Sequence, residues 1–326
     1  MRVMVTGATG FAGRPVVDAL LVRGFVVRAA LRGPALDGLS PQVEACAIGD
    51  IVACEDWSGV LRGVEVVVHL AARVHVMRDR AADPMAAFYA ANVAATRRLA
   101  RSCVDAGVRR FVYASSIKVN GEATAPGRRF DERSEPAPED AYGRSKWEAE
   151  RMLREHAGLG LDVTVLRPPL MYGPGVKGNM RSLIRAIECG LPLPFGAVDN
   201  VRSLLGVRNF ADAVALTVAC QSPRPSGRGV FRTYLLSDGE DLSTPELIRL
   251  IAKAGGWRPR LPRVPTAFLR LAGRLSGRAD EVARICGSLL VDSSLIGQEL
   301  GWQPPMPVEA GISEMVESYR ADRVGR

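Results

Sequence analysis

Gly7-Ala-Thr-Gly10-Phe-Ala-Gly13 decides the fold, because this stretch directly follows the apolar run Arg2–Thr6 and opens the amphipathic segment Phe11–Arg23. In a turn between a strand and a helix, the first glycine permits the tight bend, the second lets the backbone approach a pyrophosphate, and the third allows close helix packing. The N-terminus of the helix favours the phosphate charge. The order predicts a dinucleotide-binding unit, with contacts from Gly7, Thr9, Gly10, Phe11, Ala12 and Gly13.

The first half of the chain alternates short apolar runs with longer amphipathic segments. The expected strands are Arg2–Thr6, Phe25–Leu31, Val43–Ile48, Val64–Leu70, Arg110–Ser115 and Asp162–Arg167, and the expected helices include Phe11–Arg23, Pro84–Ala106 and Ala141–His156. Strands that are apolar throughout and separated by helices indicate a parallel sheet covered on both faces. With right-handed crossovers, this is an α/β, doubly wound parallel sheet of the Rossmann type.

The regular alternation of apolar runs and amphipathic segments ends after Arg167. Prolines and glycines break the chain into shorter elements, and helical patterns return at Thr244–Ala254 and Ser293–Leu300. We therefore expect residues 1–168 to form the dinucleotide-binding domain. Residues 169–326 should form a smaller, irregular C-terminal substrate lobe, with 205–222 packing back on the first domain.

The charge of the chain is strongly one-sided: 43 Lys and Arg stand against 35 Asp and Glu, a net charge of +8. Only Lys118, Lys146, Lys177 and Lys253 are lysines. Basic residues occur in scattered pairs rather than runs, and 6% of residues are aromatic, which leaves little for base stacking. We expect no nucleic-acid partner and look instead for anionic small molecules.

Cysteine and apolar patterns exclude further classes. The 6 cysteines and 3 histidines show no metal-ligand spacing, so no metal site is expected. No apolar stretch approaches the length of about 18 residues that a membrane span requires, and no membrane partner is expected. The N-terminus enters a strand at once, which leaves no room for a signal peptide, so a cytoplasmic location is expected.

The second expected strand bears on the choice of cofactor. A dinucleotide site for NAD usually has an acidic residue at the end of this strand, whereas here Arg28 and Arg32 occur and no acid lies between Arg28 and Asp37. Either arginine could hold the 2′-phosphate of NADP or be a solvated strand-end residue. NADP(H) is favoured, with NAD(H) as the alternative. Asp50 and Ile51 are placed to reach the adenine ring or to form a turn.

Tyr142-Gly-Arg-Ser-Lys146 is the sharpest catalytic signal. Residues four apart share a helix face, so the ammonium lies one turn from the phenol. An enzyme acting on a hydroxyl or carbonyl needs a proton donor and acceptor near neutral pH, and a nearby cation would lower a phenol pKa of about 10 toward that range. Ser115-Ser116 ends the preceding strand, where a hydroxyl could bond the same substrate oxygen or cap a helix.

These motifs carry a family resemblance. Six short motifs occur along the chain in this order: T-G-A-T-G-F-A-G at 6–13, H-L-A-A at 69–72, N-V-A-A-T at 92–96, Y-A-S-S at 113–116, Y-G-R-S-K at 142–146 and R-P-P-L-M-Y-G-P-G at 167–175. The chain resembles the extended short-chain dehydrogenases/reductases of the nucleotide-sugar epimerase/dehydratase type. The resemblance covers about the first 220 residues, and D-S-S-L-I-G-Q-E-L-G-W at 292–302 is similar to the family's C-terminal helix.

The resemblance implies a catalytic set of Ser116, Tyr142 and Lys146, a UDP-sugar substrate and a homodimer formed through Pro84–Ala106 and Ala141–His156. It implies further cofactor contacts from His69, Leu70, Ala71, Ala72, Asn92, Ser115 and Pro169, besides Tyr142 and Lys146. It also implies substrate contacts from Ser116, Lys118, Asn179, Arg202 and Arg278.

Two departures narrow the implied chemistry. Dehydratases of the family have an acidic pair after the serine, where this chain has Ile117-Lys118, so dehydration is not expected. Related 4-epimerases keep NAD bound with an acid after the second strand, which is missing here. S-S-I-K-V-N-G-E at 115–122 resembles bacterial reductases of UDP-4-keto-6-deoxy-N-acetylhexosamines, which make sugars for surface polysaccharide. We expect such a 4-keto reductase; the alternatives are a UDP-sugar 4-epimerase and a non-catalytic dinucleotide-sensing protein.

Overall fold

A seven-stranded parallel sheet forms the centre of the protein. The computed structural model describes residues 1–33, 38–74, 83–220 and 229–324, and its main sheet has the order β3-β2-β1-β4-β5-β6-β9. The strands are β1 (Arg2–Thr6), β2 (Val26–Leu31), β3 (Glu44–Ala47), β4 (Val66–His69), β5 (Arg110–Ala114), β6 (Asp162–Arg167) and β9 (Phe231–Leu235). The direction of the strand order reverses between β1 and β4. The expected doubly wound Rossmann fold is confirmed.

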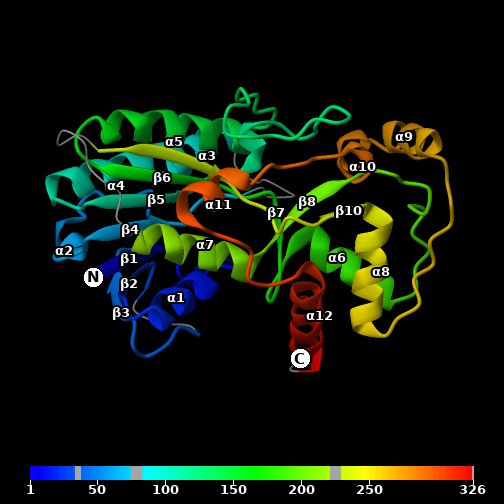
Figure 1. The fold of residues 1–326 in the computed structure, drawn as a ribbon, viewed down its shortest axis with the longest axis horizontal. Helices are drawn as coiled ribbons and strands as arrows, with labels where there is room; N and C mark the ends of the chain where they lie inside the picture. The colour runs from blue at the N-terminus through cyan, green and yellow to red at the C-terminus, as the bar shows by residue number, and fades with distance from the viewer. Residues whose placement is uncertain (34–37, 75–82, 221–228, 325–326) are drawn as a thin grey trace.

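Helices cover both faces of this sheet (Figure 1). On one face lie α1 (Gly13–Val22) and α7 (Val207–Ala219); on the other lie α3 (Pro84–Tyr89), the π-helical turn η1 (Ala90–Ala94), α4 (Ala95–Asp105) and α5 (Ala141–Ala157), with the short α2 (Ser58–Leu61) beside them. The pleat sorts the side chains: Val3 and Val5 join the apolar cluster under α1, and Met4 joins the cluster under α4 and α5.

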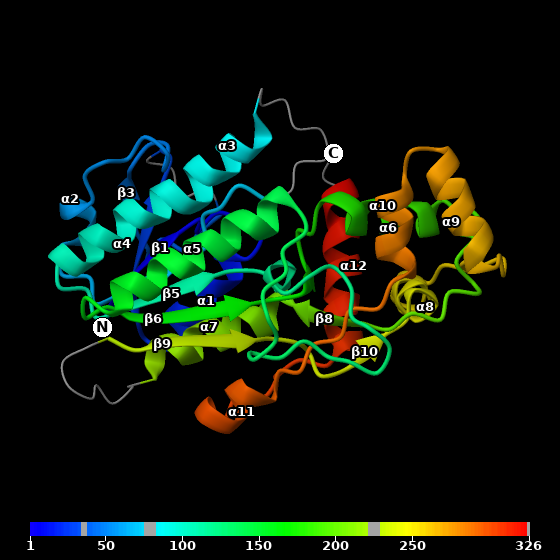
Figure 2. The same cartoon turned by 90° about the horizontal axis from the view of Figure 1, so that it is seen from above.

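A second, smaller lobe contains the sheet β10-β8-β7. Its elements are β7 (Leu170–Tyr172), α6 (Gly178–Glu188), β8 (Arg202–Gly206), β10 (Asp241–Leu242), α8 (Thr244–Gly255), α9 (Thr266–Leu275), α10 (Ala279–Cys286) and α12 (Val308–Val324). The start of α8 is fixed by a capping box between Ser243 and Glu246. Figure 2 shows this lobe beside the end of the main sheet.

The chain passes between the two lobes more than once. After β8, α7 packs against α1, and Phe210 and Val214 of α7 belong to the same apolar cluster as Val16 and Val17. Then β9 adds the last strand of the main sheet, and α11 (Ser294–Leu300) lies against it. A single boundary at residue 168 therefore does not divide the two lobes, because later segments return to the first one. Residues 221 and 222 of the expected returning segment lie outside the described residues.

Candidate active site

The glycine turn has the geometry that close approach of a phosphate requires. Gly7 has φ +70°, and a Cβ on Gly13 would lie 2.1 Å from the Gly7 carbonyl oxygen. Helix α1 has no side-chain cap and no acidic residue in its first turn, which leaves its N-terminal dipole available to an anion. Thr9 and Gly10 are exposed there. The cradle fits the pyrophosphate of a dinucleotide.

The segment after β4 lies against this turn. The Ala71 amide donates to Thr6 Oγ1 at 3.2 Å, and a Cβ on Gly7 would lie 2.8 Å from the Ala71 nitrogen. Leu70, Ala71 and Ala72 are thus placed beside the cofactor cradle. Asn92, in the π-helical turn, holds Arg73, the residue that follows Ala72. The Asn92 side chain accepts from the Arg73 amide at 2.8 Å and donates to the Arg73 carbonyl and to Ser145 Oγ.

His69 is buried inside the sheet rather than turned toward a ligand. Its Nδ1 bonds Thr6 Oγ1 at 2.7 Å and its Nε2 bonds Thr96 Oγ1 at 2.9 Å, and its ring stacks on Tyr113. Both ring nitrogens are occupied, so only the backbone of His69 is left for the cofactor contact that the resemblance implies. Burial lowers the pKa of His69 to about 3.

His69 should make the protein sensitive to acid. Because the unfolded chain takes up a proton near pH 6.5 and the folded chain does not until about pH 3, this residue stabilises the fold fully above pH 6.5. The stabilisation falls by about 2 kcal/mol by pH 5. The chain has 3 histidines, so NMR titration of the ring protons can assign His69 readily. Protonation of His69 in the folded protein above pH 5 would contradict this expectation.

Ser116, Tyr142 and Lys146 come together at the carboxyl end of β5. Asp140 caps α5 by accepting from the Gly143 amide at 2.7 Å, which fixes the first turn of the helix that carries Tyr142. Ser116 lies close enough to the Tyr142 hydroxyl to lower its pKa, and the Lys146 Nζ lies 5.9 Å from the centre of the tyrosine ring. The predicted serine, tyrosine and lysine therefore form one cluster.

The pKa values in this cluster differ from the sequence-based expectation. Burial raises the pKa of Tyr142 to about 12, against the lowering effect of Ser116, and Asp140 raises it further. Burial lowers the pKa of Lys146 to about 7, and its Nζ donates to the Ala114 carbonyl at 2.7 Å. The expected lowering of the phenol pKa by Lys146 is not seen, because burial raises the pKa of Tyr142 and also disfavours the charge of Lys146.

A buried ion pair lies beneath the cluster. The Arg167 guanidinium donates to both oxygens of the Glu150 carboxylate, at 3.0 and 2.5 Å, and also to Asn120 Oδ1 at 3.0 Å. Glu150 is 1% exposed and follows Lys146 by one helical turn. Ser115, expected to contact the cofactor, instead donates its hydroxyl proton to Glu150. This group connects β5, β6 and α5 below the reacting residues.

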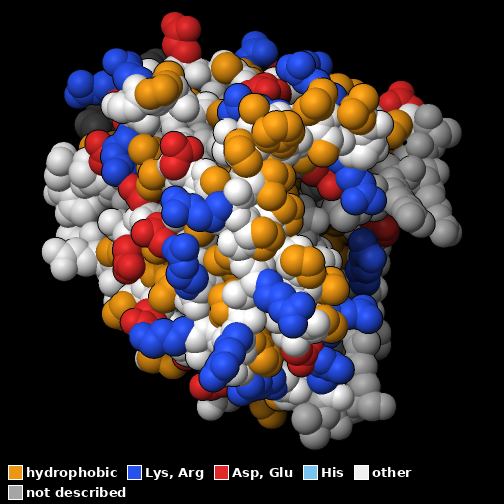
Figure 3. Space-filling model, turned by 90° about the vertical axis from the view of Figure 1, so that its right-hand side faces the viewer, with side chains coloured by type: hydrophobic (Ala, Val, Ile, Leu, Met, Phe, Trp, Pro, Cys, Tyr) orange, Lys and Arg blue, Asp and Glu red, His pale blue; other side chains and the backbone are white. Residues whose placement is uncertain are grey.

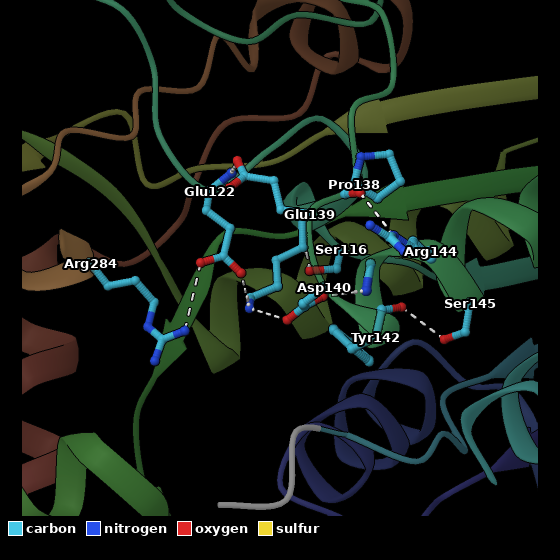
Figure 4. Close-up of polar contacts among 11 residues, drawn as sticks. Ser116, Glu122, Pro138, Glu139, Asp140, Tyr142, Arg144, Ser145 and Arg284 are labelled. Carbon is cyan, nitrogen blue, oxygen red and sulfur yellow. Dashed lines mark hydrogen bonds and ion pairs between the residues drawn. The ribbon is translucent and has the colours of Figure 1, made fainter. Parts of the chain in front are cut away.

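A second polar cluster lies on the opposite side of Ser116, between the two lobes (Figure 4). The Lys118 Nζ donates to Glu122 at 2.7 Å and to the capping residue Asp140 at 2.6 Å. From the second lobe, Arg284 lies 3.7 Å from Glu122. Figure 4 shows Arg284 reaching toward Glu122, with Tyr142 and Ser116 on the other side of the chain of charges. Lys118 is thus near the site, as expected, but paired.

The two strand-two arginines are separated by the structure. Arg28 lies across from Glu44 of β3, donates to it at 3.0 Å, and also donates to the carbonyls of Val60 and Arg62. Its guanidinium is therefore committed, and its expected role at a 2′-phosphate is wrong. Arg32 is exposed after the end of β2, and a contact between Arg32 and the 2′-phosphate of NADP stays a prediction. Asp37 lies outside the described residues.

The expected adenine contacts lie in a turn after β3. Asp50 accepts from the Val52 amide at 2.8 Å and is exposed, while Ile51 packs on the apolar cluster beneath α4. Pro169 is buried between β6 and β7. The cofactor contacts expected of Asp50, Ile51 and Pro169 stay predictions.

The expected substrate contacts in the second lobe are not gathered in one place. The Nη1 of Arg202 donates to the carbonyls of Arg284 and Gly287, at 2.8 and 2.9 Å, which fixes this guanidinium at the end of α10; burial lowers its pKa and the nearby Glu122 opposes that change. Arg278 is exposed at the start of α10, at the opposite end from Arg284, and Asn179 is exposed on α6. Arg284, which the sequence alone did not single out, forms an ion pair with Glu122 of the polar cluster.

Sequence reasoning also missed Asp140, Glu150 and Arg167. Two of these had local signals: Asp140 directly precedes the helix of Tyr142, as an N-cap would, and Glu150 follows Lys146 by four residues. Arg167 ends an apolar strand, and nothing local identifies its partner. In the described part of the chain, no three His, Cys, Asp or Glu side chains are grouped as a metal ion would need. No described helix has both the length and the apolar character of a membrane span.

The doubly wound sheet and its glycine turn define an enzyme of the NAD-dependent epimerase/dehydratase class. Residues 3–228 match the NAD dependent epimerase/dehydratase family, and the chain belongs to this family. The chain is 41% identical to "UDP-glucose 4-epimerase" of Vibrio cholerae, over 97% of this chain and 95% of that protein. It is 27% identical to "3 beta-hydroxysteroid dehydrogenase/Delta 5-->4-isomerase" of Mycobacterium tuberculosis, over 98% of this chain and 90% of the relative.

Solved structures of related proteins share the fold of this chain. "MoeE5 in complex with UDP-glucuronic acid and NAD" is 28% identical with TM-score 0.78, covering 99% of this chain and 100% of that one. The UDP-glucose 4-epimerase of Thermotoga maritima with UDP-glucose has TM-score 0.78 and covers 99% and 100% of the two chains; at 22% identity it shows the shared fold alone.

Proposed function

We propose that this protein is a UDP-sugar 4-epimerase, an enzyme that oxidises and reduces C4 of the sugar with a bound NAD. The observation that carries the proposal is the Ser116–Tyr142–Lys146 cluster beside an uncapped glycine turn. The identity of 41% to a UDP-glucose 4-epimerase along nearly the whole chain supports the UDP-sugar and the C4 position. Relatives named as steroid dehydrogenases share 27% identity.

The polar residues at the site favour a sugar over a steroid. Lys118, Glu122, Asp140 and Arg284 place four charged groups between the lobes, next to Ser116. A steroid offers no groups to pair with such charges, and burying them against an apolar ligand would be unfavourable. The hydroxyls of a sugar can replace the water that solvates them. The structure therefore supports the polar substrate class.

The chain's own residues supply binding and proton transfer. The glycine turn and the α1 N-terminus would hold the pyrophosphate, and the nicotinamide, when bound, supplies the hydride chemistry. Tyr142 moves the proton at the C4 oxygen, and Ser116 hydrogen-bonds that same oxygen. Lys146 binds the nicotinamide ribose and, when charged, stabilises the tyrosinate. Arg284 is the candidate for the UDP diphosphate, in place of Arg202 and Arg278.

A 4-keto reductase is the second candidate, and one observation favours it. The strand end that holds an acid in many NAD-binding folds here has Leu31, followed by the exposed Arg32. An arginine in this place suits the 2′-phosphate of NADP, which a reductase would consume. In this version the substrate is a UDP-4-keto-6-deoxy-N-acetylhexosamine for surface polysaccharide, and Tyr142 protonates the C4 oxygen. A purely sensory protein has no need of the Ser–Tyr–Lys cluster.

The cofactor content of the purified protein separates the two candidates. An epimerase retains NAD in near-stoichiometric amounts and interconverts UDP-sugars without added cofactor. A reductase is isolated empty and oxidises one NADPH for each 4-keto sugar reduced. Arg32→Asp should leave the epimerase active but weaken NADPH use in the reductase by at least about tenfold. Protein that does neither with any UDP-sugar would contradict both candidates.

We also propose that two copies pair through the helical segments Pro84–Ala106 and Ala141–His156. Met85 and Tyr89, on α3 in the first of these segments, are 44% and 46% exposed, and a partner copy would cover them. Sedimentation equilibrium should give twice the chain mass of 35.0 kDa. A mass of one chain at micromolar concentration would contradict the pairing.

A further inference from the structure

The whole net charge of the chain resides in one segment. Between Glu246 and Asp280 there are eight basic residues and no acidic one. The remainder of the chain holds the other 35 of the 43 Lys and Arg, which equal its 35 Asp and Glu. All eight basic side chains are exposed: Arg249, Lys253, Arg258, Arg260, Arg263, Arg270, Arg274 and Arg278. The segment therefore forms a positively charged region on an otherwise neutral molecule.

Helix α9, in the middle of this segment, has an unusual apolar face. Phe268, Leu271 and Leu275 are 63%, 53% and 82% exposed, and their spacing of three and four residues puts them on one side of the helix. The opposite side packs on α10: Gly273 is buried, and a Cβ there would lie 2.7 Å from Val282. Within the described parts of the chain, the three apolar side chains thus face away from the helix that α9 packs on.

Arginines surround these apolar side chains. Arg270 and Arg274 lie on the neighbouring side of the same helix, and Arg263 and Arg278 lie just before and just after it. We call the three apolar residues and these four arginines the α9 face. Figure 3, which views the side where α8 and α9 lie in Figure 1, shows hydrophobic side chains gathered toward the top with Lys and Arg side chains around and below them.

We propose that the α9 face docks this protein on an anionic lipid surface. An interfacial helix combines a strip of large apolar side chains with arginines beside it, which pair with lipid phosphates at the depth of the headgroups. With ten residues, α9 is about 15 Å long, too short to cross a bilayer, so it would lie in the plane of the surface. A lipid surface as partner differs from the sequence-based expectation of no membrane partner. That expectation came from the absence of long apolar runs.

Charge argues against the two other occupants of such a face. A second copy docking through the same surface would bring two segments with an excess of positive charge together, and like charges at close range repel. A nucleic acid would satisfy the arginines but not Leu271 and Leu275, since it offers stacking surfaces and no apolar phase. An anionic bilayer satisfies both parts of the face.

Docking would leave the candidate active site accessible. Arg284, which faces Glu122 at the site, lies on α10, and α10 separates the site from α9. The proposal stands whether the enzyme is an epimerase or a reductase, because no residue of the α9 face takes part in either reaction as argued above, apart from Arg278, whose expected substrate contact the structure does not support.

Vesicle sedimentation tests the proposal. The full chain should pellet with vesicles of mixed phosphatidylglycerol and phosphatidylcholine, should stay in solution with pure phosphatidylcholine, and should be released by salt. The pair F268S and L275S should weaken binding by at least about tenfold, since the apolar anchors are lost. Arg274→Glu should weaken it by about tenfold or more, because a reversed charge removes one attraction and adds one repulsion.

Matched controls change equally exposed residues elsewhere. Val22→Ser with Leu159→Ser removes two apolar side chains that are 88% and 66% exposed, and Arg128→Glu makes the same charge change outside the segment. These controls should bind like the unchanged protein, and thermal unfolding should show that every variant folds. Equal binding to neutral vesicles, absence of vesicle binding, L275S-sensitive self-association, or retention on RNA without vesicle binding would each overturn the proposal.

Discussion

Tyr142→Phe should lower turnover by about 10²–10⁴-fold while cofactor affinity stays nearly unchanged, the usual effect of losing a positioned acid–base group. The hydroxyl is the one atom removed, and it is the group whose pKa Ser116 lowers. The ring remains packed beside Phe88, whose centre lies 6.2 Å away, so the cofactor site keeps its shape. Steady-state rates on the UDP-sugar, with cofactor affinity measured separately by fluorescence titration, give both quantities.

Tyr89→Phe is the matched control, because it removes the same atom from an exposed tyrosine that directly follows Phe88 in the chain. It should leave turnover within about twofold of the unchanged protein. A Tyr142→Phe variant that keeps full turnover would show that another group moves the proton. Such a result would remove the Ser–Tyr–Lys cluster from the mechanism while leaving the fold and the cofactor cradle intact.

Arg167→Leu should destabilise the protein by about 3–5 kcal/mol, because it leaves the Glu150 carboxylate buried without its guanidinium partner. Both groups are almost wholly buried, with side chains 5% and 1% exposed, so water cannot replace the two lost hydrogen bonds. The change also frees Asn120, which Arg167 holds at 3.0 Å. Urea unfolding followed by circular dichroism measures the loss.

The same helix provides the control for this ion pair. Arg151 and Glu148 of α5 form an exposed pair at 3.2 Å, with side chains 63% and 40% exposed. Arg151→Leu should cost less than about 1 kcal/mol. A double variant, Arg167→Leu with Glu150→Leu, should recover part of the loss, since the unpaired charge is then gone. Equal costs for Arg167→Leu and Arg151→Leu would contradict the role assigned to burial.

The parts of the site that local spacing determines could be predicted from the sequence. The glycine turn needs three glycines within seven residues, and the Tyr142–Lys146 pair needs one helical turn; neither depends on distant contacts. The α/β order of the first half follows from apolar runs of strand length. For the same reason Asp140 and Glu150, at cap and helical-turn spacings, could have been identified.

The errors lie where a distant segment decides what a side chain binds. Arg28 meets Glu44 only through the register of β2 with β3, and Arg202 meets the end of α10, more than 80 residues on in sequence. Likewise β9 joins the main sheet from beyond the second lobe's first strands, which no local pattern announces. The sequence shows that the unbalanced basic residues lie between Glu246 and Asp280, and the structure is needed to see that four of them lie on or beside the exposed apolar side of α9.

Deuterium at C4 tests the central claim most directly. UDP-glucose labelled with deuterium at C4 is incubated in ordinary water with the protein as purified, and the product is read by NMR. Hydride transfer at C4 predicts a product inverted at C4 that keeps its deuterium, because the label leaves and returns as hydride without meeting solvent. Inversion with loss of the deuterium to water would contradict hydride transfer at C4.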